Sequence, residues 1–264
     1  MNLNRQNLDG VRCFLLDMDG TFYLGNQLIP GSLDFIDKVL ATGRDFLFLT
    51  NNSSHNAAFY VEKLARMGLA IDRRRVLTSG EATCAKLNEL YPGKRAFVLG
   101  NEFLVEEFRE AGIPVDNEDP EIVVVGFDTT LDYKKMQAVC DFLRAGLPYI
   151  ATHPDFNCPT ETGFMPDIGA IMAFIEASTG RRPELIVGKP HTGIVEAVRQ
   201  RTGLALSELA MVGDRLYTDI ETGRRSGMLS ILVMSGETTE EMLSESDTRP
   251  DLKFGRLSDM IPLL

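Results

Sequence analysis

Short apolar runs alternate along this chain with longer segments in which apolar residues recur at helical spacing. Towards the two ends, strands are predicted at 11–16, 46–49, 209–212 and 230–233, with helices at 32–42, 56–67 and 192–201. The middle repeats the pattern, with strands at 96–99, 122–125 and 149–151 and helices at 102–111 and 133–145. This alternation predicts an α/β fold of the doubly wound type, with helices covering parallel sheets.

The middle series is predicted to be a separate domain inserted into the fold that the two ends form. Loop-forming residues mark its borders at Ser79–Gly80 and at 180–183. We therefore predict a core of residues 1–79 and 183–264 and an inserted α/β domain of residues 80–182.

Composition narrows the class of protein. Hydrophobic residues at 44% and charged residues at 25% suit a soluble globular protein, and no apolar run approaches the roughly 20 residues of a membrane span. A cytoplasmic location is expected because the first residues lack an apolar signal segment. The net charge of −11 argues against nucleic acid as a partner. The one basic cluster, Arg73–Arg75, suits a solvated turn or contact with an anionic ligand.

Two carboxylates follow the first predicted strand, in the string Asp17-Met18-Asp19-Gly20-Thr21. In parallel sheets ligands collect at the carboxyl ends of the strands. One carboxylate there can attack phosphorus while the other carries a proton to the leaving oxygen. A pair of aspartates alone also suits a surface turn or a bare metal site.

Polar groups follow two further apolar runs. The segment Thr50–Ser53 comes after the strand at 46–49 and offers hydroxyl, amide and backbone donors at the start of a helix. Such a segment binds anions, and it equally suits a helix cap. Lys189 follows the apolar residues 185–187, as a surface lysine or as a compact charge that offsets a phosphate.

Asp214 and Asp219 follow the strand predicted at 209–212. On one helix their side chains would point some 140° apart, at about 100° per residue, so they share a site only if Asp214 lies on the loop before the helix. Carboxylate oxygens are ligands that suit Mg²⁺. Capping by either aspartate is the alternative.

In this order, the motifs DxDGT, Thr or Ser, Lys and GDxxxD resemble those of the haloacid dehalogenase (HAD) superfamily. The strings FLLDMDGTFYLG, FLTNNSS, VGKP and MVGDRLYTDI resemble subfamily IIA, which includes NagD-type nucleotide phosphatases, 4-nitrophenyl phosphatases and pyridoxal phosphatases. The resemblance covers essentially the whole chain. It implies a HAD-like parallel sheet core with an inserted α/β cap, which would be residues 80–182.

The resemblance also implies a covalent mechanism. Asp17 would attack phosphorus, and Asp19 would protonate the leaving alcohol and then activate water. Mg²⁺ would be bound by the Asp17 carboxylate, the Asp19 backbone carbonyl and Asp214, with Asp219 ordering the water around the metal. The phosphate ligands that it implies are Thr50, Asn51, Asn52 and Lys189.

Within the cap, the loop 153–166 resembles the segment that faces the active site in these enzymes. Relatives usually carry Asn where this chain has His153, and Gly where it has Asp167. We expect His153 and Asp155 to select the ester, although a loop histidine satisfied by a neighbour is the alternative for His153. A homodimer formed through the cap is also implied.

The expected partner is a small phosphorylated metabolite, of the sugar phosphate, nucleoside monophosphate, phosphoglycolate or pyridoxal phosphate type. The alternative function is a phosphoaspartate signalling or binding protein of similar topology without turnover, which also gathers acids, a hydroxyl and a lysine at strand ends. The position of Asp19, two residues after the nucleophile, favours the phosphatase because a second acid there supplies turnover.

Overall fold

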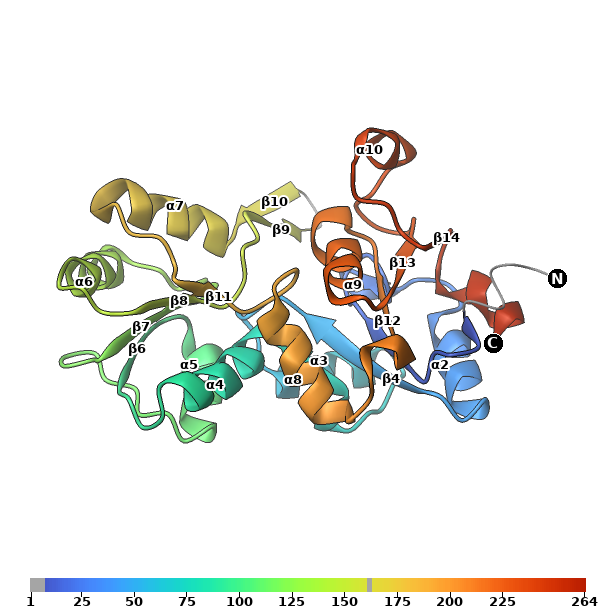
Figure 1. Ribbon diagram of the computed structural model, residues 1–264, viewed down its shortest axis with the longest axis horizontal. Coiled ribbons are helices and arrows are strands. Elements are labelled where there is room, and N and C mark those ends of the chain that lie inside the picture. The colour runs from blue at the N-terminus through green and yellow to red at the C-terminus, as the bar shows by residue number, and fades with distance from the viewer. Residues whose placement is uncertain (1–7, 161–162) are drawn as a thin grey trace. The chain divides into compact units, whose positions relative to one another are not determined.

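A computed structural model describes residues 8–160 and 163–264, so Glu161 and Thr162 of the predicted cap loop lie outside the described residues. The chain forms two compact units (Figure 1). The first unit contains Met1–Thr50, Val61–Leu77 and Val198–Leu264, and the second contains Asn51–Tyr60 and Thr78–Ala197. Parallel sheets in both units confirm the predicted α/β fold.

The first unit is built on a six-stranded sheet in the order β14-β13-β12-β1-β4-β5. Its strands are β14 (Leu252–Phe254), β13 (Leu229–Val233), β12 (Leu209–Gly213), β1 (Cys13–Leu16), β4 (Asp45–Thr50) and β5 (Val76–Thr78). The central strands β1 and β12 are buried along their whole length, which is why they appear in the sequence as uninterrupted apolar runs. Leu16 pairs in register with Val212 and with Phe48, so the carboxyl ends of β1, β12 and β4 lie at one edge of the sheet.

Helices and a small hairpin complete this unit. They are α2 (Ser32–Ala41), the 3₁₀ helices η1 (Arg73–Arg75), η2 (Leu206–Glu208) and η4 (Leu257–Leu263), the π-helix η3 (Leu216–Ile220), α9 (Glu221–Ser226), α10 (Glu240–Glu245), and the hairpin of β2 (Tyr23–Leu24) with β3 (Gln27–Leu28). Residues of α3 (Ala57–Arg66) and α8 (Thr192–Thr202) belong to both units. The N-cap of α2 is Gly31, and the hydroxyl of Ser32, the first residue of the helix, donates to the carbonyl of Phe22 at 2.9 Å.

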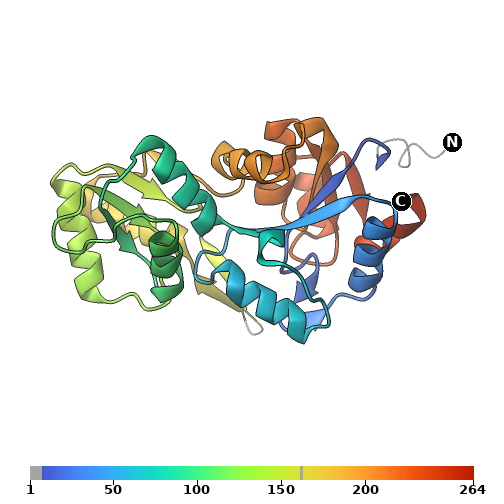
Figure 2. The same ribbon diagram turned by 90° about the horizontal axis from the view of Figure 1, so that it is seen from below.

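The second unit has a four-stranded parallel sheet in the order β11-β8-β7-β6. Its strands are β11 (Leu185–Ile186), β8 (Tyr149–Ala151), β7 (Ile122–Val125) and β6 (Ala96–Leu99). The helices α6 (Tyr133–Arg144) and α7 (Ile168–Thr179) lie on one face, and α4 (Ser79–Leu90) and α5 (Glu102–Glu110) lie on the other (Figures 1 and 2). Side chains from β6, β7 and β8 pack against α6 and α7 in the buried core of the unit.

Two features of the second unit differ from the sequence prediction. Ser79 and Gly80, interpreted as part of a loop, begin α4, because the Thr78 hydroxyl caps the helix by accepting from Glu81 N at 2.9 Å. The antiparallel hairpin of β9 (Asn157–Thr160) and β10 (Gly163–Pro166) was not predicted. All four residues of β10 are exposed, so the strand has no buried face to give an alternating pattern.

Of the helices in the described ranges, none combines the length and the apolar character that a membrane crossing requires. The four cysteines are free thiols, and Cys13, Cys84 and Cys140 are buried.

Candidate active site

Asp17 lies directly after β1, at the carboxyl edge of the first unit's sheet. Its backbone N–H donates to the carbonyl of Val212 on β12 at 2.9 Å, which continues the pairing of the two strands by one residue. The chain then turns at Gly20, whose φ of 84° favours glycine, and Gly20 N donates to the carbonyl of Tyr23 at 2.7 Å. This turn fixes the backbone that carries Asp19.

Three of the predicted carboxylates meet in this unit. Asp17, Asp214 and Asp219 each offer one oxygen, and these oxygens lie within 4.8 Å of one another. Asp214 lies on the loop between β12 and η3, which is the condition that the helical angle imposed, and η3 brings Asp219 to the same place. Asp214 is 2% exposed and Asp219 is fully buried.

Three glycines allow the backbone to pack closely against two of these carboxylates, those of Asp214 and Asp219. A Cβ atom at Gly20 would lie 2.7 Å from Asp214 Cγ, and one at Gly236 would lie 2.8 Å from Asp214 Cβ. A Cβ atom at Gly213 would overlap the side chain of Asp219. Carboxylate oxygens gathered at this spacing are the donors that a small, hard divalent cation prefers, so these residues fit such a cation.

The electrostatics of this cluster favour a cation and a protonated acid. Burial, together with the charges of Asp17 and Asp219, raises the pKa of Asp214 well above its ordinary value. Burial also raises the pKa of Asp19. The positive charge of Lys63 lowers this pKa and the negative charge of Asp17 raises it, and burial has the largest effect. A raised pKa favours the protonated form that a general acid needs.

The loop after β13 completes the surroundings of Asp214, and the sequence reasoning missed it. Glu237 N donates to Asp214 Oδ2 at 2.7 Å, and Thr238 N donates to the Asp214 carbonyl at 3.2 Å. Ser235 Oγ donates to the carbonyl of Gly20 at 2.7 Å. This loop follows the predicted strand 230–233, so the strand-end argument used for the other motifs could have found it.

Thr50 is the last residue of β4 and is 7% exposed. Because β4 pairs with β1 in parallel, Thr50 lies at the same edge of the sheet as Asp17. The sequence predicted a polar segment from Thr50 at the end of this strand, and in the structure Thr50 ends β4.

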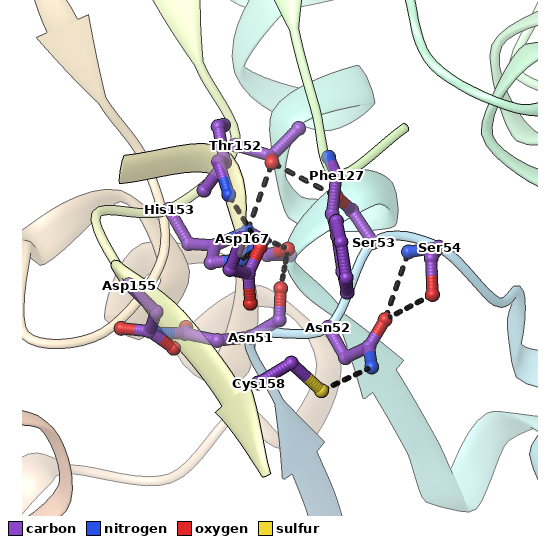
Figure 3. A network of polar contacts seen from close by, with 12 residues as sticks. Asn51, Asn52, Ser53, Ser54, Phe127, Thr152, His153, Asp155, Cys158 and Asp167 are labelled. Carbon is purple, nitrogen blue, oxygen red and sulfur yellow. Dashed lines mark hydrogen bonds and ion pairs between the residues drawn. The ribbon is translucent and has the colours of Figure 1, made fainter. Parts of the chain in front are cut away.

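Asn51 and Lys189 lie together in the second unit. Asn51 Nδ2 donates to the Lys189 carbonyl at 3.0 Å, and Lys189 N donates to Asn51 Oδ1 at 2.8 Å. Asn51 Nδ2 also lies 3.2 Å from Asp155 Oδ2 (Figure 3). Asn52 closes a turn instead, because its Oδ1 accepts from Ser54 N at 2.9 Å.

His153 and Asp167, the two departures from the usual family residues, form a pair in this unit. His153 Nε2 lies 3.1 Å from Asp167 Oδ1, and both side chains are buried (Figure 3). His153, Asp155 and Asp167 also place ligand atoms within 4.8 Å of one another. Neighbours thus surround His153, as in the alternative interpretation of this histidine.

Comparison with known proteins is consistent with this geometry. Residues 14–114 match the family described as haloacid dehalogenase-like hydrolase, and residues 186–260 match a second HAD hydrolase-like family. An acid sugar phosphatase of Staphylococcus aureus is 36% identical over 251 residues, which cover 95% of this chain and 96% of the relative.

Solved structures give the same result. A 4-nitrophenylphosphatase from Thermotoga maritima is 46% identical and superposes with a TM-score of 0.95 over 97% of this chain and 98% of its own. NagD from E. coli K-12 is 30% identical, with a TM-score of 0.87 over 94% and 98% of the two chains. The chain therefore belongs to the haloacid dehalogenase superfamily, in the subfamily IIA of NagD-like and 4-nitrophenyl phosphatases.

Proposed function

We propose that this protein is a Mg²⁺-dependent phosphatase that hydrolyses small phosphate monoesters through a phosphorylated Asp17. The observation that carries the proposal is that Asp17, which directly follows β1, places a carboxylate oxygen within 4.8 Å of oxygens of Asp214 and Asp219. Carboxylates of this kind repel one another unless a cation neutralises them. The one carboxylate of the three that is partly exposed is Asp17, as a nucleophile must be.

The reaction has two balanced steps. In the first, a carboxylate oxygen of Asp17 attacks phosphorus, the bond from phosphorus to the ester oxygen breaks, and Asp19 gives its proton to the departing alkoxide. In the second, Asp19 takes a proton from water, the water oxygen attacks phosphorus, and the bond to Asp17 breaks. The products are an alcohol and inorganic phosphate, and both aspartates return to their starting states.

The residues that would hold Mg²⁺ are Asp17, the Asp19 backbone carbonyl and Asp214, with Asp219 beside them. When bound, the ion neutralises the carboxylates and the phosphoryl oxygens and orients the reacting group. The chain itself positions Asp214: Gly20 and Gly236 pack closely against its side chain, and Glu237 N in the loop after β13 donates to its carboxylate.

Thr50, Asn51, Asn52 and Lys189 are the proposed phosphate ligands. A hydroxyl, amides and a lysine stabilise phosphoryl oxygens by hydrogen bonds and charge, and positioning of this type supplies most of the rate in phosphoryl transfer. Because a relative is named an acid sugar phosphatase, we propose sugar phosphates as the first substrates to test.

The decisive experiment is hydrolysis of p-nitrophenyl phosphate and a panel of sugar phosphates by the wild type and by Asp17→Asn. The variant should lose turnover because an amide cannot form the phosphoenzyme. The matched control is Asp37→Asn, which makes the same change at an exposed position on α2 and should leave turnover unchanged. Normal turnover by Asp17→Asn would refute the covalent mechanism, and a stable phosphoenzyme in the wild type would favour the signalling alternative.

A further inference from the structure

Both ring nitrogens of His153 have polar neighbours inside the second unit. Nε2 lies 3.1 Å from Asp167 Oδ1, and Nδ1 lies 3.0 Å from Thr152 Oγ1 and 3.4 Å from Ser79 Oγ. The side chain is fully buried. Because a carboxylate only accepts hydrogen bonds, Nε2–H is the donor to Asp167. Nδ1 is then the acceptor for a neighbouring hydroxyl group. Polar contacts within the second unit therefore hold the ring at both nitrogens.

Asp167 in turn is fixed by the start of α7. Its Oδ1 accepts from Ile168 N at 2.6 Å, which makes it the N-cap of the helix. Its own N–H donates to the carbonyl of Phe156 at 2.9 Å, and Gly169 N donates to the carbonyl of Asp155 at 2.7 Å. The N-cap and first residues of α7 therefore form hydrogen bonds both to the histidine and to the loop that carries Asp155.

Contacts through Gly188 and Asn51 connect His153 and Asp155 to Lys189. Gly188 N donates to the Thr152 carbonyl at 2.7 Å, and a Cβ atom at Gly188 would lie 2.8 Å from His153 Cβ and 2.7 Å from Asn51 Oδ1. Asp155 contacts the Asn51 amide, which makes the two hydrogen bonds to the Lys189 backbone. Gly188 therefore packs directly against the Cβ atom of His153, and Asn51 holds the backbone of Lys189.

We infer, given the phosphatase activity proposed above, that His153 and Asp167 are positioning residues that fix Asn51 and Lys189 for the phosphoryl group. They act through the loop that carries Asp155 and through Gly188, and they do not touch the leaving group. The pair thus sets the affinity for phosphate of every substrate alike.

Two isosteric replacements test which arm of the histidine matters. The amide nitrogen of Gln in His153→Gln takes the place of Nε2 and can still donate to Asp167. The shorter amide of His153→Asn takes the place of Nδ1 and leaves Asp167 without its imidazole. Tyr149→Phe is the control, because it changes a buried side chain of the same unit that lies outside the proposed machinery.

We expect His153→Asn to lower kcat/KM by about 10- to 100-fold for all substrates alike, because displacement of a positioning group by about 1 Å has effects of this size. His153→Gln should recover most of that loss. The binding of inorganic phosphate in the presence of Mg²⁺, measured by titration calorimetry, should weaken in parallel in His153→Asn. The Mg²⁺ concentration for half-activation should change by no more than about twofold, because the acids of the metal cluster belong to the first unit.

A double-mutant cycle completes the test. If the two side chains act as one pair, His153→Asn combined with Asp167→Ala should be no worse than the more damaged single variant, within about twofold. Multiplied losses, equal activity of the Asn and Gln variants, or a reordering of substrates by His153→Asn would each overturn the inference. Phosphate binding needs no turnover, so an inactive wild type would refute the proposed function while the calorimetry still decides this one.

Discussion

Replacement of Asp214 by Asn should stabilise the metal-free protein although it destroys part of the metal site. Asp214 is 2% exposed and shares its site with Asp17 and Asp219. An amide of the same shape removes one of the like charges and keeps an acceptor oxygen for Glu237 N, which donates to Asp214 at 2.7 Å. Less repulsion in the folded state means a larger free energy of unfolding.

The magnitude follows from two opposing effects. Like charges no more than 4.8 Å apart repel by at least about 3.5 kcal/mol at an effective dielectric constant of about 20, so two such neighbours make ionisation of Asp214 costly. In the folded wild type, Asp214 avoids this repulsion by staying protonated. Keeping the proton at pH 7 costs about 4 kcal/mol of folding free energy, at about 1.36 kcal/mol per pH unit above the ordinary pKa of 3.8. The amide keeps the acceptor for Glu237 N but puts a nitrogen in place of the oxygen that accepts from Thr21 Oγ1 at 3.3 Å, and loss of that hydrogen bond costs about 2 kcal/mol. The net gain in Asp214→Asn should be about 2 kcal/mol.

The gain should depend on pH in a defined direction. Below the ordinary pKa of 3.8, Asp214 is protonated in both folded and unfolded states, so the variant has no advantage. As the pH rises, the unfolded wild type loses its proton before the folded wild type does, since the folded pKa is raised. The advantage of the variant should therefore grow from about pH 4 until the folded carboxyl also ionises.

Urea unfolding in EDTA at pH 4 and pH 7 measures this difference, with the exposed change Asp37→Asn as the control. Addition of Mg²⁺ should reverse the order, because the wild type keeps every proposed metal ligand and gains more stability from metal binding than the variant. An Asp214→Asn protein that is less stable than the wild type in EDTA at pH 7, or a difference that does not change with pH, would refute the reasoning.

Three further predictions concern other residues. Gly236→Ala should raise the Mg²⁺ concentration for half-activation by at least about tenfold, because a Cβ atom there meets Asp214; Gly10→Ala, with open space around it, should not, and equal constants would contradict the crowding argument. Glu221→Gln should lower the free energy of unfolding by about 1–2 kcal/mol at pH 7, because hydrogen bonds from Arg224 and then Arg225 lower the pKa of Glu221 to about 2. That difference should disappear as the pH falls from about 4.5 towards 2, and a constant difference in urea titrations would count against it. Tyr149→Phe should raise the free energy of unfolding by about 1 kcal/mol, and with it the midpoint of thermal unfolding, since within the described part of the chain the buried hydroxyl has no hydrogen-bond partner. A lower midpoint would show that the hydroxyl has a partner.

The sequence by itself determined the fold class and the places where chemistry collects. The strands β1 and β12 are buried on both faces, so they appear in the sequence as apolar runs and could be predicted from that pattern alone. The acids Asp17 and Asp214 follow these runs directly, and parallel pairing brings such residues to one edge whatever the details of packing. The angle of about 140° between Asp214 and Asp219 on one helix also required Asp214 to lie on the preceding loop if the two share a site, and in the structure it lies there.

The tertiary structure alone decided how those residues are held. The loop with Glu237 and Thr238 contacts Asp214 across more than twenty positions of sequence, and no local pattern encodes such a contact. The pairing of His153 with Asp167 likewise depends on where α7 begins relative to β8. Local periodicity reports only which face of an element is buried, whereas hydrogen bonds between distant side chains depend on the packing of whole elements.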